Sequence, residues 1–342
     1  MPEVPVNVLV CTSLNDAQLE RVRAANPRLR VYDGAALLLK GLPEALRPGQ
    51  KPAPIRETKP TLEQLFAEAD VILAARRMPP DLAARAPRLK WVQMPLAGLD
   101  GTGVDQLPAQ SGIRISTATG INALPVAEYA MMAIMMLVKD AKRLIHSNEA
   151  RSWDRYDLGQ LRGKALAIVG FGTVGREVAR LAEPFGMKLL AVKRKVDPAE
   201  HLPPWVLPAA KLDEVLGQAD IVTLCVPATP ATRGMIGERQ LALMRHGAML
   251  VNVARGDVID DVALVQALED GRLAGAALDV FAQEPLTPES PYWTLPNVLV
   301  TGHVAGLFEG YDGAVVDLFI ANLGRYLAGE PLVNEVDREM GY

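Results

Sequence analysis

The sequence predicts an α/β protein built on a doubly wound parallel sheet, with a second and smaller α/β domain. Short runs rich in β-branched residues alternate with helical stretches along the 342-residue chain, as they do in α/β folds. The runs are continuously apolar, which is typical of parallel strands that helices cover on both faces. A single hydrophobic core stops growing at about 250 to 300 residues, so we expect two domains with a site between them.

The first series of strands belongs to the smaller domain. We expect its strands at residues 6–10, 71–73, 91–92 and 113–115, with helical segments between them. Residues 41–60 contain five prolines and little periodicity, which indicates a surface excursion between two elements. We assign no chemistry to that segment.

The second series predicts the larger, doubly wound sheet. Six continuously apolar strands are expected at residues 165–169, 189–192, 221–226, 249–251, 276–278 and 298–300. A long helical segment precedes the series at 125–145 and another follows it at 311–327. Both segments suit the connections between two domains.

Composition argues against several kinds of partner. Lys and Arg number 36 against 40 Asp and Glu, and no long basic run is present that would attract a nucleic acid or an anionic bilayer. The uncharged apolar run at 129–138 is far shorter than the roughly 20 residues that span a bilayer. Cys11 and Cys225, the only cysteines, lie in apolar runs, which favours a reducing, cytoplasmic location and no thiolate metal site.

The first strand of the second series runs directly into Gly170-Phe-Gly-Thr-Val-Gly175 and then into an amphipathic helix. A G-x-G-x-x-G pattern between a strand and a helix is the fingerprint of a Rossmann dinucleotide-binding domain. Gly170 permits the tight turn, Gly172 lets the backbone approach a pyrophosphate, and Gly175 lets the helix pack closely on the strand. The backbone N–H groups of Thr173 and Val174 would face the anion. We therefore expect a nicotinamide dinucleotide cofactor.

The end of the next strand bears on the choice between NAD and NADP. An acidic residue that binds the ribose 2′-hydroxyl is expected there, roughly 20 residues beyond the glycine loop. The sequence has Lys193, Arg194 and Lys195 instead. Because cationic side chains attract a 2′-phosphate and a carboxylate repels it, we expect NADP to be preferred. The alternative is a solvated basic strand end.

Besides the glycine loop, several further motifs follow one another in a definite order, at residues 161–164, 227–232, 251–256, 278–281 with 284–285, and 297–306. In order and spacing they resemble the D-isomer-specific 2-hydroxyacid dehydrogenase family, and in particular its glyoxylate and hydroxypyruvate reductases. The resemblance covers roughly residues 90–328. It implies a Rossmann NAD(P)-binding domain at 120–304 and a flavodoxin-like substrate domain made of 1–119 and 305–342. It also implies a homodimer formed through the cofactor domain.

Three side chains suit the reduction of a 2-keto acid, which needs a proton donor for the developing alkoxide and a cation for the carboxylate and carbonyl. His303 follows the last strand, at the carboxyl edge where open α/β sheets bind ligands, and is the expected proton donor. By resemblance, Glu284 is the partner carboxylate that keeps the imidazole protonated near neutral pH. Arg255 resembles the family's substrate arginine, whose planar fork can hold a carboxylate and a keto oxygen together.

The resemblance also implies further binding residues. Backbone N–H groups of Leu96, Ala97 and Gly98 would bind the substrate carboxylate from the other domain, and domain closure would join them to Arg255. Asp279 would orient the nicotinamide carboxamide. The remaining cofactor positions are Val226, Pro227, Thr232, Val253 and Gly306.

Two positions depart from the family pattern. The usual acid at the ribose position is absent, and Gly302 stands where proline commonly precedes the histidine. Glycine leaves the backbone before His303 freer than proline would. Elsewhere, we expect Trp153 and Trp293 to be packing residues and Asp260 to cap the helix that follows it.

Together these features predict an NADP(H)-preferring reductase of small 2-keto acids such as glyoxylate or hydroxypyruvate. Phosphoglycerate or phosphite oxidation are the alternatives among enzymes. From another class, the alternative is a cofactor-sensing binding protein like the family's corepressors, which would bind the cofactor tightly without turnover on keto acids.

Overall fold

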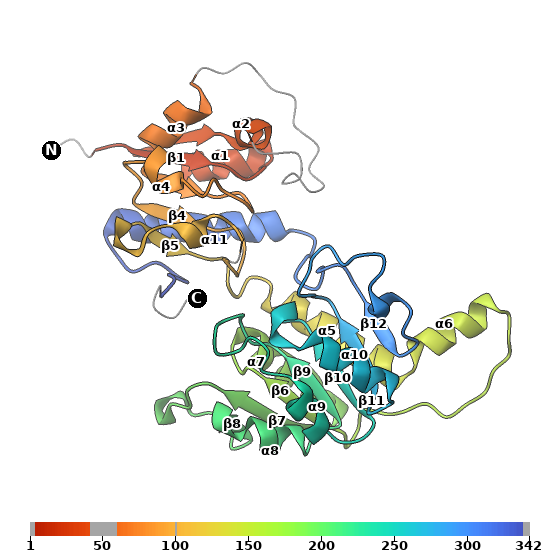
Figure 1. Ribbon diagram of the computed structural model, residues 1–342. Coiled ribbons are helices and arrows are strands. Elements are labelled where there is room, and N and C mark those ends of the chain that lie inside the picture. Colours follow the sequence, from red (N-terminus) through yellow and green to blue (C-terminus); the bar gives the residue numbers. More distant parts are fainter. Residues whose placement is uncertain (1–3, 42–59, 100, 338–342) are drawn as a thin grey trace. The chain divides into compact units, whose positions relative to one another are not determined.

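The computed structural model describes residues 4–41, 60–99 and 101–337. The chain forms two compact units, one made of Met1–Ile121 with Glu309–Tyr342 and the other of Asn122–Phe308 (Figure 1). The domain limits expected from the sequence were 119/120 and 304/305. Most of the expected surface excursion, residues 42–59, lies outside the described part of the chain.

Unit 1 contains a five-stranded parallel sheet in the order β2-β1-β3-β4-β5, which is the flavodoxin-like order that was expected. Its strands are β1 (Val6–Val10), β2 (Leu29–Asp33), β3 (Val71–Leu73), β4 (Trp91–Gln93) and β5 (Arg114–Ser116). Strand β2 was missed in the sequence. It is an edge strand with no fully buried residue, so it lacks the continuous apolar run used to find the others.

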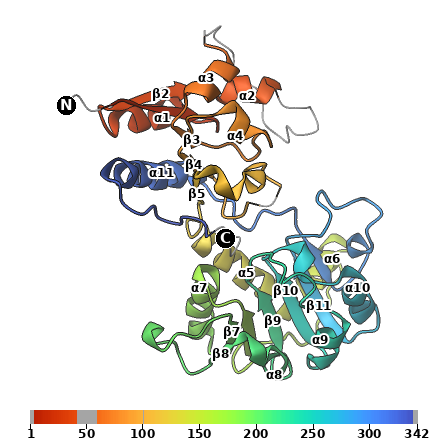
Figure 2. The ribbon, with the colours of Figure 1, turned by 60° about the vertical axis from the view of Figure 1, so that its left-hand side comes forward.

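Helices cover both faces of this sheet (Figure 2). They are α1 (Asp16–Ala24), α2 (Ala35–Gly41), α3 (Leu62–Glu68), α4 (Leu82–Arg85) and α11 (Tyr311–Ala328). Helices α1 and α3 each begin with a capping box, formed by Asn15 with Gln18 and by Thr61 with Gln64, which satisfies N–H groups that the first turn leaves unpaired.

Helix α11 brings the end of the chain back to unit 1. The ring of Trp91, in β4, lies 5.3 Å from that of Phe319 and 5.6 Å from that of Tyr326. Asn322 is fully buried and donates from Nδ2 to Gln93 Oε1 at 3.0 Å. These contacts make α11 part of the core of unit 1, although nearly 200 residues separate it from β5.

Unit 2 contains a seven-stranded parallel sheet in the order β12-β11-β10-β9-β6-β7-β8. The strands are β6 (Ala165–Val169), β7 (Lys188–Lys193), β8 (Val206–Pro208), β9 (Ile221–Leu224), β10 (Ala248–Asn252), β11 (Leu273–Leu278) and β12 (Val298–Val300). This is the Rossmann order with one added strand, and the direction of winding reverses between β6 and β9. The expected number of six strands was wrong because the edge strand β8 was missed: it has only three residues, prolines precede and end it, and only Val206 in it is buried.

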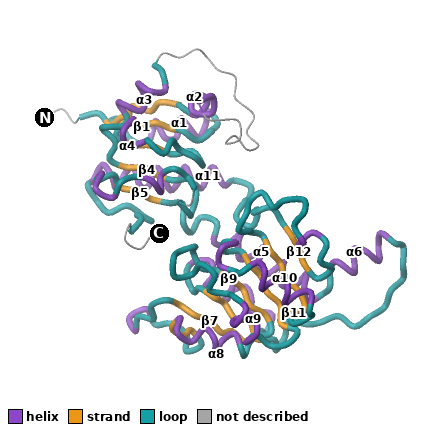
Figure 3. The backbone as a smooth tube through the Cα atoms, viewed as in Figure 1, coloured by secondary structure: helices purple, strands orange, loops and turns teal. Residues whose placement is uncertain are grey.

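The helices of unit 2 are α5 (Ala123–Val138), α6 (Ala141–Glu149), α7 (Thr173–Ala182), α8 (Leu212–Leu216), α9 (Glu238–Leu243) and α10 (Asp261–Glu269). The single helix expected at 125–145 is wrong: the chain turns at Asp140, which has φ 48° and caps α6. Helix α6 and the loop after it extend away from the sheet (Figure 3). The expected cap at Asp260 is confirmed, since its side chain accepts from the N–H groups of Val262 and Ala263.

Within the described ranges, no helix has the length and apolarity that crossing a membrane requires.

Candidate active site

The glycine loop joins β6 to α7 at the point where the winding of the sheet reverses. Gly170 has φ 102°, and a Cβ added there would lie 2.6 Å from the carbonyl oxygen of Cys225. A Cβ on Gly175 would lie 2.1 Å from the carbonyl oxygen of Gly170, whereas one on Gly172 would meet no atom within 4 Å. The two outer glycines are therefore required for packing, and the middle one leaves the open space that a pyrophosphate needs.

The start of α7 supplies the donors for this space. Thr173 and Val174 are the first residues of the helix, and the preceding Gly172 provides no side-chain cap. Their N–H groups belong to the first turn, which has no partners within the helix and carries the positive end of its dipole. The loop therefore fits a dinucleotide phosphate.

The other expected cofactor residues lie around the same edge. Val226 contacts the loop, because its Cγ1 is 2.8 Å from a Cβ added at Gly170. The hydroxyl of Thr232 donates to the carbonyl oxygen of Pro227 at 2.6 Å and accepts from the N–H of Thr229, so it closes its own loop. Val253 packs against the core on the α5 side of the sheet. Gly306 approaches Asn122 so closely that an added Cβ would lie 2.7 Å from its Nδ2.

The end of β7 lies beside the glycine loop, since Gly170 donates its N–H to the carbonyl oxygen of Val192 at 3.0 Å. Lys193 is the last residue of that strand, and Arg194 follows it on the surface. Lys193 does not stand alone there: its ammonium and the guanidinium of Arg176 both contact the carboxylate of Glu200. No sequence pattern pointed to Glu200.

His303 and Glu284 form a direct pair. The imidazole Nδ1 lies 2.8 Å from Glu284 Oε2, and Glu284 Oε1 accepts from the backbone N–H of Phe281 at 3.0 Å. Because an ionised carboxylate only accepts hydrogen bonds, Nδ1 carries hydrogen and Nε2 is the ring atom directed away from this partner. The imidazole remains about half exposed, with 47% of its surface accessible.

The carboxylate of Glu284 is stabilised in its charged form. Burial by itself would raise the pKa of the Glu284 carboxyl, but the hydrogen bonds from His303 and Phe281 and the charges of His303 and Arg255 outweigh it and lower the pKa below 4.5. The positive charge of Arg255 therefore acts on the same carboxylate. The three expected catalytic side chains lie in one electrostatic environment.

Arg255 is held at the end of β10 by a compact turn. The side chain of Asn252, which is 1% exposed, donates to the carbonyl oxygen of Arg255 at 3.0 Å and accepts from the N–H of Ala254 at 3.0 Å. The guanidinium donates from Nη1 to the carbonyl oxygen of Ala254 at 2.7 Å. Gly256 follows, and an added Cβ there would lie 1.9 Å from the carbonyl carbon of Phe281. This close approach brings the Arg255 turn against the segment that carries Glu284.

Asp279 anchors the loop that carries His303. Its carboxylate is 1% exposed and accepts from the Thr301 hydroxyl at 2.6 Å and from the N–H groups of Val304 and Ala305, each at 2.9 Å. The carbonyl oxygen of Asp279 also accepts from the N–H of His303 at 2.8 Å. These four bonds surround a residue in the left-handed region, since His303 has φ 56°, a conformation that side chains other than glycine adopt only under constraint.

Tyr129 and Thr301 support the position of Asp279 from behind. The hydroxyl of Tyr129, in α5, contacts that of Thr301, and because Thr301 donates to Asp279 it accepts from Tyr129. Burial is the main reason why the pKa of Tyr129 is raised, and the charge of Asp279 adds to the effect. Neither Tyr129 nor Thr301 was predicted, because residues 172 positions apart share no local pattern.

Gly302 does not need to be glycine for steric reasons, because an added Cβ would meet no atom within 4 Å. The backbone N–H of His303 is held by the carbonyl oxygen of Asp279 instead, and its side chain is held by Glu284. The greater freedom expected from the missing proline is therefore offset by the pairing with Glu284, which was expected, and by the bonds of Asp279 to this loop, which were not.

In unit 1, the loop after β4 offers unpaired donors. Among the described residues, the backbone N–H groups of Leu96, Ala97 and Gly98 have no hydrogen-bond acceptor. The loop itself is held from the other side, because the carbonyl oxygen of Leu96 accepts from Ala118 N–H at 2.9 Å and that of Ala97 from the Thr119 hydroxyl. Three such N–H groups in a row can bind a carboxylate.

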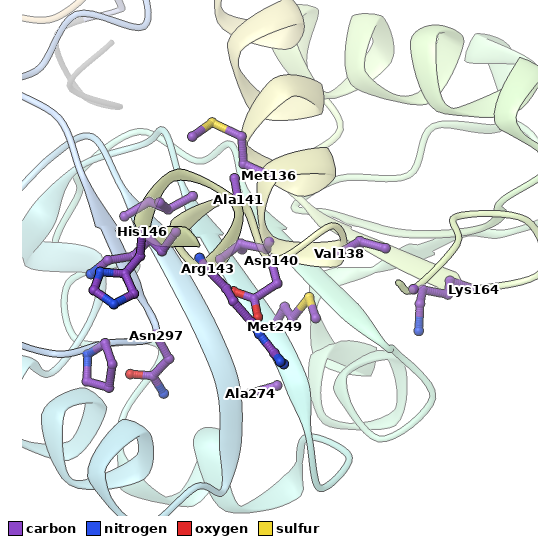
Figure 4. A pocket seen from close by; sticks show the side chains of 15 residues that line it. Met136, Val138, Asp140, Ala141, Arg143, His146, Lys164, Met249, Ala274 and Asn297 are labelled. Carbon is purple, nitrogen blue, oxygen red and sulfur yellow. The ribbon is translucent and has the colours of Figure 1, made fainter. Parts of the chain in front are cut away.

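A cavity in unit 2 lies away from this site. About 760 Å³ in volume, it lies among residues at the amino ends of the strands, including Lys164, Met249, Ala274 and Asn297 (Figure 4). The candidate catalytic residues stand at the carboxyl ends. In the described part of the chain, no group of three or more His, Cys, Asp or Glu side chains could hold a metal ion.

The sheet of unit 2 has the Rossmann order, and its glycine loop fits a phosphate. A histidine paired with an acid and an arginine lie at the carboxyl edge of this sheet. Together these features define the class of nicotinamide-dependent dehydrogenases. Residues 131–305 match the family described as "D-isomer specific 2-hydroxyacid dehydrogenase, NAD binding domain". The chain is 33% identical to a glyoxylate reductase of Thermococcus gammatolerans over 80% of this chain and 84% of that protein. It is 36% identical to an (S)-sulfolactate dehydrogenase of Chromohalobacter salexigens over 73% of this chain and 82% of that protein.

Among solved structures, an NADPH-dependent glyoxylate/hydroxypyruvate reductase of Sinorhizobium meliloti, in complex with NADP and sulfate, superposes with a TM-score of 0.78. It is 26% identical in sequence, and the match covers 98% of this chain and all of that one. The chain belongs to the D-isomer specific 2-hydroxyacid dehydrogenase family. It is therefore an oxidoreductase that acts on 2-hydroxy acids.

Because the pKa of Glu284 is lowered, we predict that part of the free energy of unfolding is lost as the pH falls into the acid range. Its contacts stabilise the folded chain at pH values above the unfolded pKa, close to 4.5, and this contribution is lost as pH falls through the lower folded pKa. Glu284→Gln should therefore unfold at lower denaturant than the wild type at pH 7, and the difference should shrink below about pH 5. Glu269→Gln, at an exposed acid, is the control. A difference that stays constant down to pH 4 would contradict this account.

Proposed function

We propose that the protein is an NADP(H)-preferring reductase of small 2-keto acids of the glyoxylate and hydroxypyruvate kind. The observation that carries the proposal is the 2.8 Å pairing of His303 Nδ1 with Glu284, which leaves Nε2 to serve as an acid, beside the positive charge of Arg255. The glyoxylate reductases among its relatives support the choice of small keto acids.

The proposed roles follow from the chemistry of each group. When bound, the reduced cofactor supplies the hydride that the keto carbon accepts. His303 gives the proton from Nε2 to the keto oxygen, and Glu284 stabilises the imidazolium that precedes this transfer. Arg255 polarises the carbonyl and holds the substrate carboxylate. The unpaired N–H groups of Leu96, Ala97 and Gly98 are proposed to bind the same carboxylate.

The proposed cofactor site consists of the glycine loop and the residues around it. The pyrophosphate would be held by Gly170, Gly172, Thr173, Val174 and Gly175. The rest of the cofactor would be contacted by Val226, Pro227, Thr232, Val253 and Gly306. Lys193 and Arg194 are proposed to attract the 2′-phosphate of NADP. The carboxylate of Asp279 is committed to the His303 loop, so we propose that it serves the nicotinamide end of the site by holding that loop.

A substrate panel with both cofactors tests the function. We expect NADPH oxidation to be fastest, by kcat/KM, with glyoxylate or hydroxypyruvate and slower with longer keto acids, and we expect NADPH to be favoured over NADH. Oxidation of phosphite, 3-phosphoglycerate or sulfolactate at a higher kcat/KM would replace this proposal with another dehydrogenase activity. Tight cofactor binding without turnover on the whole panel would favour a cofactor-sensing binding protein.

We also propose a homodimer formed through unit 2. No residue of α6 is buried, and Leu144, Ile145 and Trp153 expose 44%, 52% and 93% of their surface. The expected packing role of Trp153 is thus absent within one chain. Helix α6 also carries Arg143 and His146, which line the 760 Å³ cavity, so a second copy that covers this helix would remove apolar area from water.

Light scattering during gel filtration tests the dimer. We expect twice the chain mass of 36.9 kDa, and a smaller mass for Ile145→Asp combined with Trp153→Asp. The matched control is Val262→Asp. Val262 is an exposed apolar residue too, with 81% of its surface accessible, but it lies on α10. A wild-type mass of one chain would contradict the dimer.

We propose a reducing compartment, the cytoplasm, as the place where the enzyme works. Cys11 and Cys225 are both free thiols, and burial is the main reason why their pKa values are raised. Thiols of this kind serve as packing groups and are not built to form disulfides. Fractionation of cells that make the protein would test its location.

A further inference from the structure

One carboxylate lies between two cations at the strand end where the sequence has no acid. Glu200 Oε2 is 2.9 Å from Arg176 Nη2, and the Lys193 ammonium contacts the same oxygen. Glu200 belongs to the short 3-10 turn Pro198–Glu200, Lys193 ends β7, and Arg176 lies in the first turns of α7. Three separate elements therefore converge on one anion.

The position of this cluster relates it to the adenosine ribose. The end of β7 is hydrogen-bonded to the glycine loop through Gly170 and Val192, and the guanidinium of Arg176 lies 5.1 Å from the centre of the Phe171 ring, within that loop. In Rossmann domains the ribose 2′ position faces the end of the second strand, which is β7 here. A 2′-phosphate at this place would meet Lys193 and Arg176, the two cations that Glu200 already engages.

We infer that Glu200 sets the ratio of NADP to NAD binding, by occupying the cations that a 2′-phosphate would use. This inference rests on the proposed function. A 2′-phosphate must displace the Glu200 carboxylate, because two anions cannot share the same donors without repulsion. NAD has no 2′-phosphate, so it binds without displacing Glu200. The Glu200 carboxylate can instead accept a hydrogen bond from the 2′-hydroxyl of NAD, which is the role of the acid that the end of β7 lacks.

The competing explanation is that the cluster is an ordinary surface ion pair. The side chains of Arg176, Lys193 and Glu200 expose 45%, 22% and 35% of their surface, and pairs in this range contribute little to stability. The two explanations differ in what removal of the carboxylate does. Removal of a surface pair changes the binding of neither cofactor, whereas removal of a competitor for the 2′-phosphate site strengthens the binding only of ligands that carry this phosphate.

Calorimetric titration of the full-length protein distinguishes them without reliance on turnover. The ligands are NADPH, NADH, and the fragments 2′,5′-ADP and 5′-AMP. We expect Glu200→Gln to tighten binding of NADPH and 2′,5′-ADP by about tenfold and to leave 5′-AMP unchanged or weaker. Glu214→Gln is the matched control, because Glu214 pairs with Lys211 at 2.8 Å and lies in α8, outside the cluster of Arg176, Lys193 and Glu200.

A second substitution tests the cation. Lys193→Gln should weaken 2′,5′-ADP binding more in the Glu200→Gln background than in the wild type, because Glu200 no longer neutralises the ammonium. Dissociation constants of NADPH and 2′,5′-ADP that stay within twofold in Glu200→Gln would overturn the inference. A wild type that favours NADH, with a gain for NADPH in Glu200→Gln, would contradict the proposed NADP preference and support the role of Glu200. Failure of both fragments to bind would overturn both.

Discussion

We expect His303→Ala to lower kcat for the reduction of glyoxylate by about 10²- to 10⁴-fold, which is the usual contribution of a positioned general acid. The imidazole is hydrogen-bonded to Glu284 through Nδ1, and its Nε2 faces away from that pair. Dissociation constants for the cofactor should change little, because the glycine loop and the strand end at Lys193 are separate from the His303 loop.

The measurement is single-turnover oxidation of NADPH at saturating keto acid, which isolates the chemical step. His246→Ala serves as the control, because His246 is exposed and precedes β10 at the opposite edge of the sheet. A loss of less than tenfold in His303→Ala would rule out His303 as the proton donor. A pH profile that loses its basic limb in this variant would support the assignment further.

The second large effect is expected from Asp279→Asn. This change replaces one carboxylate oxygen with an amide group that donates, so at least one of the three donors from Thr301, Val304 and Ala305 loses its acceptor. A buried donor without a partner costs about 1 to 3 kcal/mol. We expect a loss of stability of this size and a decrease in kcat larger than any change in KM, because the bonds of Asp279 hold the left-handed backbone at His303.

A graded series separates positioning from simple destabilisation. Thr301→Val removes one of the bonds to Asp279, and Tyr129→Phe removes only the contact behind Thr301, so their effects on kcat should decrease in that order. Urea unfolding at pH 7 gives the stability of each variant. If Asp279→Asn loses stability but keeps the kcat of the wild type, the residue supports the fold and does not position His303.

The fold of this protein was largely predictable because its core strands are covered on both faces. All four strands expected in unit 1 and all six expected in unit 2 are present, with ends shifted by a few residues. The errors fall where burial is incomplete. Strands β2 and β8 are edge strands, and the turn at Asp140 interrupts an otherwise helical pattern. Apolar periodicity reports burial, so it carries little information on edges and breaks.

The part of the candidate site that was predictable is the set of residues that directly follow parallel strands. In a parallel sheet, residues that follow different strands meet at one edge, and Arg255, Asp279 and His303 follow β10, β11 and β12. The pairing of His303 with Glu284 came from the resemblance to a family. The supporting contacts of Asn252, Thr301 and Tyr129 were not predicted, because polar residues near strand ends are common and most only cap turns.

By itself, the sequence determined the glycine loop, the order of the strands that surround it, and the kinds of side chain at the sheet edge. These features depend on local backbone sterics and on continuous burial, which a chain encodes in neighbouring residues. Only the tertiary structure decided which charges meet: Glu200 with Lys193 and Arg176, and Asp279 with the loop of His303. Electrostatic contacts depend on distance in space, and residues brought together by the winding of the sheet leave no mark in the local sequence.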